Sequence, residues 1–169
     1  MTRSSAREIA IHIVYELSFG TDRAEEVLDR ELTRERFQVL EAESELYRQF
    51  PNEKQVQYIR DLVKGVFAHG AELDDYIARY AKGWSFARIP RMAAAIMRTA
   101  MYEVLYMPAI PNSAAINEAV EIAKNYEPAE VVSFINGILG SFVRAEFADS
   151  APKPEKKEEE AAGPEEPEE

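Results

Sequence analysis

The sequence predicts an all-α protein, a bundle of about seven helices joined by short turns. Two observations support this fold class. Apolar residues recur every three or four positions through most of residues 1–149, which is the spacing of a buried helix face, and no segment alternates apolar and polar residues as a strand would. Gly, Pro and capping residues fall between these segments, where helices end and begin. No internal repeat is evident.

The first part of the chain contains two predicted helices and one ambiguous segment. Residues 3–19 form the first helix, which Gly20 can end. Thr21 or Asp22 can cap the second. The highly charged segment 34–50 has few apolar residues, so it either continues the second helix or forms a poorly packed insert.

Five further helices complete the predicted bundle. Asn52 can cap a helix that runs to Gly70, and residues 72–82 form the next one. The last three each begin near a proline, which the first turn of a helix tolerates: Pro90, Pro111 and Pro128.

The end of the chain differs from the body in composition. Residues 150–169 contain eight Glu, three Lys and four Pro, and they have too little apolar surface to offset the entropy of ordering. We therefore expect a helical domain over 1–149 and a disordered acidic tail over 150–169. The tail carries −5 of the net charge of −11, which leaves −6 on the body. This net negative charge disfavours binding to nucleic acid, so any RNA contact must come from a local basic patch.

Motifs typical of catalysis or cofactor binding are missing from the sequence. There is no Cys, and His12 and His69 lie on different predicted helices, without the spacing that would hold a metal on one face. No Gly-rich phosphate loop or nucleophile elbow is present. The sequence thus predicts a binding protein without cofactor or metal, not an enzyme. It shows no signal peptide and no apolar run near the ~18 residues of a membrane span, so we expect a cytoplasmic protein with no membrane partner.

Four positions break the pattern of the last two helices: Asn117, Glu118, Asn136 and Gly137. A Gly inside a helix costs about 1 kcal/mol relative to Ala, so such positions tend to serve function or close packing. We expect Asn117 and Glu118 to tie neighbouring helices together by hydrogen bonds. Asn136 is expected to bond a neighbouring backbone, and Gly137 to allow close helix approach.

Several motifs resemble those of the NusB family of transcription antitermination factors. The most specific are AINEAVEIAK over 115–124 and FINGIL over 134–139, in this order and at this spacing. RDLVKGV over 60–66, RTAMYE over 98–103 and ARE over 6–8 add to the match. The resemblance implies an all-helical protein of two helical subdomains. It also implies binding to boxA-type single-stranded RNA together with NusE, a small-subunit ribosomal protein, in an antitermination complex with RNA polymerase, chiefly on ribosomal RNA operons.

The resemblance also implies a set of site residues in this chain. Cations would neutralise phosphates and aromatic rings would stack on unpaired bases. Arg3 and Arg7 match an amino-terminal arginine cluster, whereas Ser4 and Ser5 stand where well-studied members have Arg, which removes two phosphate contacts. The remaining matches to family site positions are Tyr15, Tyr80, Arg98, Glu130 and Phe134.

Alternatives stay open for these residues and for the whole chain. Packing is an alternative for Tyr15, Tyr80 and Phe134, and a structural ion pair is an alternative for Arg98. If Arg3 and Arg7 grip RNA, they should form one surface close to Tyr15. A homodimer or scaffold with weakened RNA binding is a second function. An RNA-binding module of a ribosomal RNA methyltransferase is a third, which the absence of a Gly-rich strand-turn-helix after residue 142 disfavours.

Overall fold

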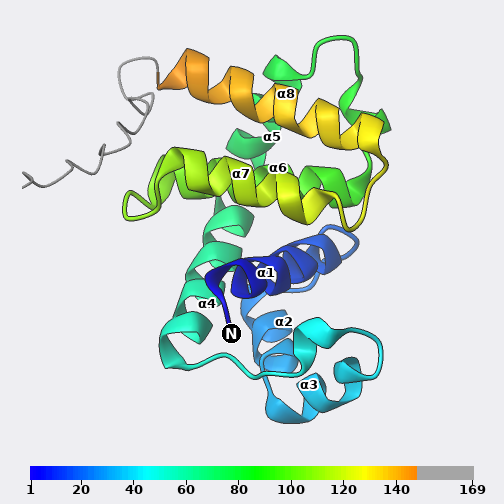
Figure 1. The fold of residues 1–169 in the computed structure, drawn as a ribbon, viewed down its shortest axis with the longest axis vertical. Helices are drawn as coiled ribbons and strands as arrows, with labels where there is room; N and C mark the ends of the chain where they lie inside the picture. Colours follow the sequence, from blue (N-terminus) through cyan, green and yellow to red (C-terminus); the bar gives the residue numbers. More distant parts are fainter. Residues whose placement is uncertain (148–169) are drawn as a thin grey trace, which may run out of the picture.

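The computed structural model describes residues 1–147, and within this range it contains helices and no strand. The predicted all-α class is therefore confirmed (Figure 1). The elements in chain order are α1 (Arg3–Leu17), α2 (Ala24–Glu31), α3 (Arg34–Glu41), the 3-10 helix η1 (Glu45–Tyr47), α4 (Glu53–Ala68), α5 (Gly70–Tyr80), the 3-10 helix η2 (Phe86–Arg88), α6 (Arg91–Tyr106), α7 (Asn112–Ala123) and α8 (Ala129–Glu146). The tail predicted over 150–169 lies outside the described residues. None of the described helices combines the length and the apolar character that crossing a bilayer requires.

Helix α6 lies at the centre of the fold. It packs against α1, α4, α5, α7 and α8, and most of its residues are buried. Four of the buried positions are small: Ala93, Ala94, Ala95 and Ala100. Short side chains let neighbouring helix axes approach closely, which explains how one helix can contact five others.

Helix α1 lies between two groups of helices. It crosses the molecule between α5–α8, at the top of Figure 1, and α2 and α3 at the bottom. It packs mainly on α4 and α6 through a broad buried face that is apolar except for Arg7, while Glu8, His12 and Glu16 lie outside this face. Any polar side chain on α1 that points into either contact must therefore find a partner inside the protein.

Segment 34–50 forms a packed helix of its own, which explains why there is one α-helix more than predicted. Thr33 caps α3 by accepting a hydrogen bond from the Arg36 backbone N–H at 3.2 Å. Phe37 is 3% exposed and contacts the rings of Tyr47 and Phe50 edge to face, with centroids 5.1 and 5.0 Å apart. The expectation of a continued helix or a poorly packed insert was wrong, because three aromatic residues form a small core that the sparse pattern did not reveal.

The predicted helix caps are confirmed at one position and wrong at another. Asn52 forms a full capping box with Gln55 at the start of α4. Helix α2 begins after Arg23 without a side-chain cap, so neither Thr21 nor Asp22 caps it.

The close packing expected at Gly137 occurs at Gly65 instead. A Cβ at Gly137 would meet nothing within 4 Å, whereas a Cβ at Gly65 would lie 1.9 Å from Cζ of Tyr102. Asn117 and Asn136 are exposed and bond no neighbouring helix among the described residues. The expected ties through these two amides were therefore wrong, since both side chains point away from the bundle.

Candidate nucleic-acid and partner interface

Arg7 lies in the protein core rather than on the surface. Its side chain is 1% exposed, and its guanidinium donates two parallel hydrogen bonds to Glu103 of α6, from Nε to Oε1 at 2.6 Å and from Nη2 to Oε2 at 2.9 Å. Nη1 also pairs with Glu118 of α7. The guanidinium thus ties α1 to α6 and α7, so Glu118 does link helices as expected. The expected solvent-facing role of Arg7 was wrong, because α1 turns this side chain inward.

Tyr58 of α4 completes the buried charge network. Its hydroxyl donates to Oε2 of Glu103 at 3.1 Å. Burial, followed by the charge of Glu103, raises the pKa of Tyr58, so this hydroxyl stays protonated and able to donate. Burial alone would lower the pKa of Arg7, but the hydrogen bond and charge of Glu103 raise it, so Arg7 remains a cation. Every charge in the network therefore has a partner, as a buried ion pair requires.

Arg3 is the member of the predicted pair that remains exposed. Its guanidinium lies 5.5 Å from the ring centroid of Tyr58, within cation–π range. Tyr15 is twelve residues further along α1, about 18 Å at 1.5 Å per residue. It packs against Phe19, with ring centroids 4.8 Å apart. The single surface expected from Arg3, Arg7 and Tyr15 is therefore not present.

Glu130 and Phe134 lie on α8, whereas Tyr80 is the last residue of α5 and contacts α8 from there. The Tyr80 hydroxyl donates to Oε1 of Glu146 at 2.5 Å, near the carboxyl end of α8, and this bond raises the pKa of Tyr80. Glu130 is exposed in the first turn, and Phe134 follows one turn later. Phe134 contacts Trp84, with ring centroids 4.7 Å apart. Phe134 and Glu130 therefore share one end of α8, and Tyr80 lies near the other.

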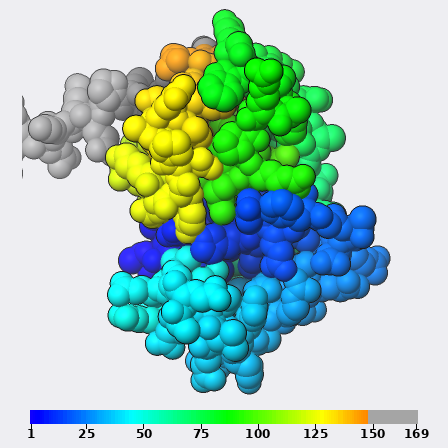
Figure 2. All heavy atoms as spheres, turned by 90° about the vertical axis from the view of Figure 1, so that its right-hand side faces the viewer, coloured from blue at the N-terminus to red at the C-terminus, as the bar shows by residue number. Residues whose placement is uncertain are grey.

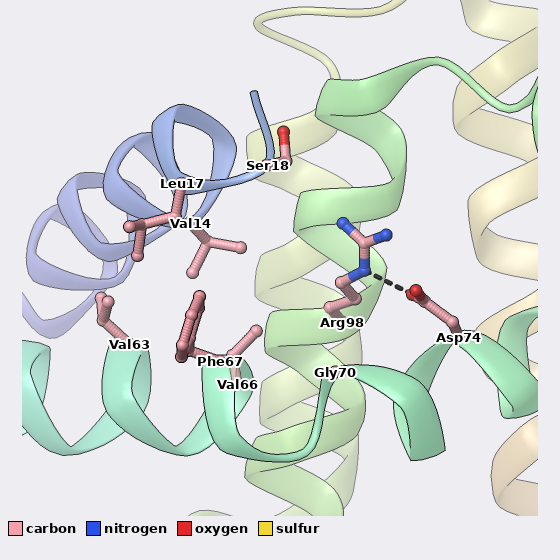
Figure 3. Close-up of a pocket in the computed structure, with 9 residues that line it drawn as sticks. All are labelled: Val14, Leu17, Ser18, Val63, Val66, Phe67, Gly70, Asp74 and Arg98. Carbon is pink, nitrogen blue, oxygen red and sulfur yellow. Dashed lines mark hydrogen bonds and ion pairs between the residues drawn. The ribbon is translucent and has the colours of Figure 1, made fainter. Parts of the chain in front are cut away.

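Arg98 forms the ion pair that was one alternative for it. Its Nε donates to Oδ1 of Asp74 at 2.5 Å, so α6 and α5 are joined, and its guanidinium also lies 5.8 Å from the ring centroid of Phe86. Figure 3 shows this ion pair at one end of a cavity of about 240 Å³. The apolar end is formed by residues of α1 and α4: Val14, Leu17, Val63, Val66 and Phe67.

This cavity is the middle of a longer groove. A hollow of about 530 Å³ shares Phe67 with it, and another of about 250 Å³ shares Ser18 and Arg98. Phe67 is 55% exposed, and Phe86, in the third hollow, is 38% exposed. The hollow beside α2 is lined mostly by charged residues, so the name apolar groove is kept for the other two hollows, from Phe67 past Arg98 to Phe86.

One rim of the apolar groove is formed at the carboxyl end of α1. Phe19 is 56% exposed there, and the Arg91 guanidinium lies 4.3 Å from its ring centroid. Arg91 Nη1 also donates to the carbonyl of Ser18 at 3.0 Å. Tyr15 joins this rim through its contact with Phe19. Phe19, Phe67 and Arg91 were not predicted as site residues, since only the packing of α1, α4 and α6 shows which side chains remain on the surface.

His12 joins three parts of the chain that are distant in sequence. The Tyr126 hydroxyl donates to Oε1 of Glu8 at 2.6 Å, so its oxygen is free to accept from Nε2–H of His12 at 2.5 Å. Nδ1 then accepts from the Tyr47 hydroxyl at 2.6 Å. Burial lowers the pKa of His12, and the charge of Glu8 opposes this shift only in part. His12 is thus a structural link between α1, η1 and the α7–α8 turn.

Comparison with known proteins places this geometry in a family. The NusB family model matches residues 4–144. The transcription antitermination protein NusB of Acetivibrio thermocellus is 41% identical over 147 residues, covering 87% of this chain and 92% of the relative. The structure of T. maritima NusB matches with a TM-score of 0.65 and 27% identity, covering 85% of this chain and 92% of that one. A chain in the crystal structure of antitermination factors NusB and NusE in complex with dsRNA shares the fold, with a TM-score of 0.67 and 20% identity over 85% of this chain and 96% of its own length. The chain therefore belongs to the NusB family.

Proposed function

We propose that this chain is a transcription antitermination factor that binds boxA-type single-stranded RNA together with a NusE-type protein, chiefly on ribosomal RNA operons. The observation that carries this proposal is the match of the family model to residues 4–144, together with a 41% identical relative named as an antitermination protein. The factor would join an RNA polymerase complex in the cytoplasm. It would act by binding and not as an enzyme.

The apolar groove is the proposed site of the protein partner. Three large rings lie on it or at its rim with 38–56% of their surface exposed: Phe19, Phe67 and Phe86. Exposed aromatic rings beside an Arg are typical of protein interfaces, where they become buried anchors. Tyr15 and Arg98 would support these anchors from the rim and from inside the cavity.

The proposed RNA contacts lie outside the apolar groove. Arg3 is an exposed cation at the amino end of α1, and Phe134 is a half-buried ring near the start of α8, with Glu130 one turn before it. Since Arg7 is buried and Ser4 and Ser5 replace two family cations, few phosphates are neutralised. RNA affinity without the partner should therefore be weak, with a shallow dependence on salt.

The test is fluorescence anisotropy of a labelled boxA-like single-stranded RNA, measured with and without the NusE-type protein across a salt series. We expect weak binding by the chain alone and a clear gain when the partner is added. Absence of any gain at low salt would refute the proposal. Residues 1–149 should behave as the full chain does, because the proposal assigns no binding role to 150–169.

A scaffold or homodimer is the second candidate function, and the burial of Arg7 favours it over a strong RNA binder. Size-exclusion chromatography separates the two functions. A stable dimer that gains no RNA affinity from the partner would support the scaffold.

A further inference from the structure

The loop between α5 and α6 exposes an unusual set of side chains. All residues from 82 to 88 are exposed. Gly83 has φ of +83°, a conformation that side-chain-bearing residues rarely adopt, and it turns the chain immediately before Trp84. Trp84 is 38% exposed. In Figure 2 the green surface that includes this region adjoins the yellow surface around the start of α8.

Trp84 is held in place without being covered. Its backbone N–H donates to the carbonyl of Ala81 at 3.2 Å, and its ring contacts Phe134 at 4.7 Å between centroids with 39° between planes. Phe134 belongs to α8, so a regular helix supports one side of the indole. An apolar side chain of this size is stabilised by burial, and over a third of its surface remains in water. The arrangement presents an open aromatic surface on a fixed support.

The cations of this loop differ from most others in the protein. Lys82 and Arg88 are exposed and form no ion pair with any carboxylate among residues 1–147. Arg91, just beyond the loop, contacts Phe19 and a backbone carbonyl rather than a carboxylate. The nearest acid along α8 is Glu130, one turn before Phe134. In a body with net charge of −6, this is a local excess of positive charge.

We propose that Trp84 and Phe134 form a stacking platform for an unpaired base of single-stranded RNA, and that Lys82 and Arg88 neutralise the phosphates on either side of that base. Aromatic rings interleaved with free cations are the combination that single-stranded nucleic acid requires, because rings bind base faces and cations bind the backbone. This inference rests on the proposed function. It adds Trp84, Lys82 and Arg88 to the RNA contact already proposed at Phe134, in a loop whose Phe86 lies at the end of the apolar groove.

The chain contains one Trp, so its fluorescence reports on the platform directly. The full chain is titrated with labelled boxA-like RNA, and RNA anisotropy and Trp84 emission are recorded together. We expect the emission to be quenched along the same curve as the anisotropy. Trp84→Ala should weaken binding by between about 5-fold and 150-fold, which corresponds to about 1–3 kcal/mol for one stacked base. Trp84→Phe should retain most of the affinity because it keeps a ring.

Matched variants separate the platform from general effects. Lys82→Ala with Arg88→Ala should reduce the slope of log affinity against log salt by roughly 1.4, from two lost phosphate contacts. Arg23→Ala with Arg144→Ala removes the same charge elsewhere and should leave the slope closer to wild type. Circular dichroism of Trp84→Ala should match wild type, since the loop lies outside the core.

Three results would overturn the inference. Saturating anisotropy without any change in Trp84 emission, with Trp84→Ala binding as wild type does, rejects the platform but leaves the proposed function standing. Quenching by the NusE-type protein, with no further change in Trp84 emission when RNA is added, would assign Trp84 to the protein partner instead. No RNA binding at low salt, with or without partner, would reject the proposed function itself.

Discussion

Replacing Arg7 by Ala is the sharpest test of the internal charge network. The substitution removes the cation that donates two hydrogen bonds to Glu103, whose side chain is 0% exposed. Glu103 would keep only the hydroxyl of Tyr58 as a partner. Glu118 is 39% exposed and can turn to water. Breaking a buried ion pair from one side typically costs about 3–5 kcal/mol, because an uncompensated charge stays in the core.

The assay is urea unfolding followed by circular dichroism, which yields the free energy of unfolding. We expect Arg7→Ala to lower it by about 3–5 kcal/mol, with the melting temperature falling by roughly 10 °C for a domain of this size. Arg3→Ala is the matched control, since it removes a cation one turn earlier on an exposed site. Its effect should stay within about 0.5 kcal/mol.

A double substitution checks the cause of the loss. Arg7→Met combined with Glu103→Leu removes both buried charges, and it should recover much of the stability that Arg7→Ala loses. The opposite outcome is a free energy of unfolding for Arg7→Ala within about 1 kcal/mol of wild type together with a fall in RNA affinity. That outcome would mean the guanidinium faces solvent in the working protein.

Three other predictions follow from local geometry. Gly65→Ala should destabilise the fold by about 1–3 kcal/mol, because its Cβ would overlap the Tyr102 ring. Gly137→Ala meets open space and should stabilise the fold by up to about 1 kcal/mol. Equal effects of the two variants in urea unfolding would contradict this. Burial lowers the pKa of His12 below 6.5, so between the folded pKa and 6.5 the unfolded chain binds more protons than the folded chain. The free energy of unfolding should therefore fall as the pH drops through this window. His12→Gln should flatten this fall between pH 7 and pH 5 in urea unfolding. Phe67→Ala should abolish the gain in RNA affinity from the NusE-type partner without changing RNA binding by the chain alone, as measured by anisotropy; a full gain in this variant would move the partner away from the apolar groove.

The helical architecture was predictable because it depends on local pattern. The start of α4 at Asn52 and the helical segments around 3–17, 91–106 and 129–146 follow from apolar periodicity and from capping or proline residues. The separation of α2 from α3 at Leu32 and Thr33 was not predicted. Helix α3 is stabilised by contacts among Phe37, Tyr47 and Phe50 rather than by a strong periodic apolar stripe.

The candidate site was predictable only in part. Residue types and motif spacing indicated the family and the matching positions. They did not show whether each side chain faces the core or the solvent. Arg7 and Arg3 are four apart on α1, yet α6 and α7 cover one and leave the other in water. The apolar groove was not predicted, because Phe67 reads as one more apolar residue of α4 until the neighbouring helices are placed.

By itself the sequence determined that this chain folds as a helical bundle of the NusB type, since helix periodicity and two specific motifs are properties of residue order. Only the tertiary structure decided which polar residues serve the core and which serve the surface. Arg7 and Glu118 are used inside, while Asn117, Asn136 and Trp84 face outward. The physical reason is that the residue order of a helix does not say whether a given cation faces water or a carboxylate, because this depends on the helices packed around it. Packing against α6 and α7 selects the second, because a buried Glu103 needs that charge.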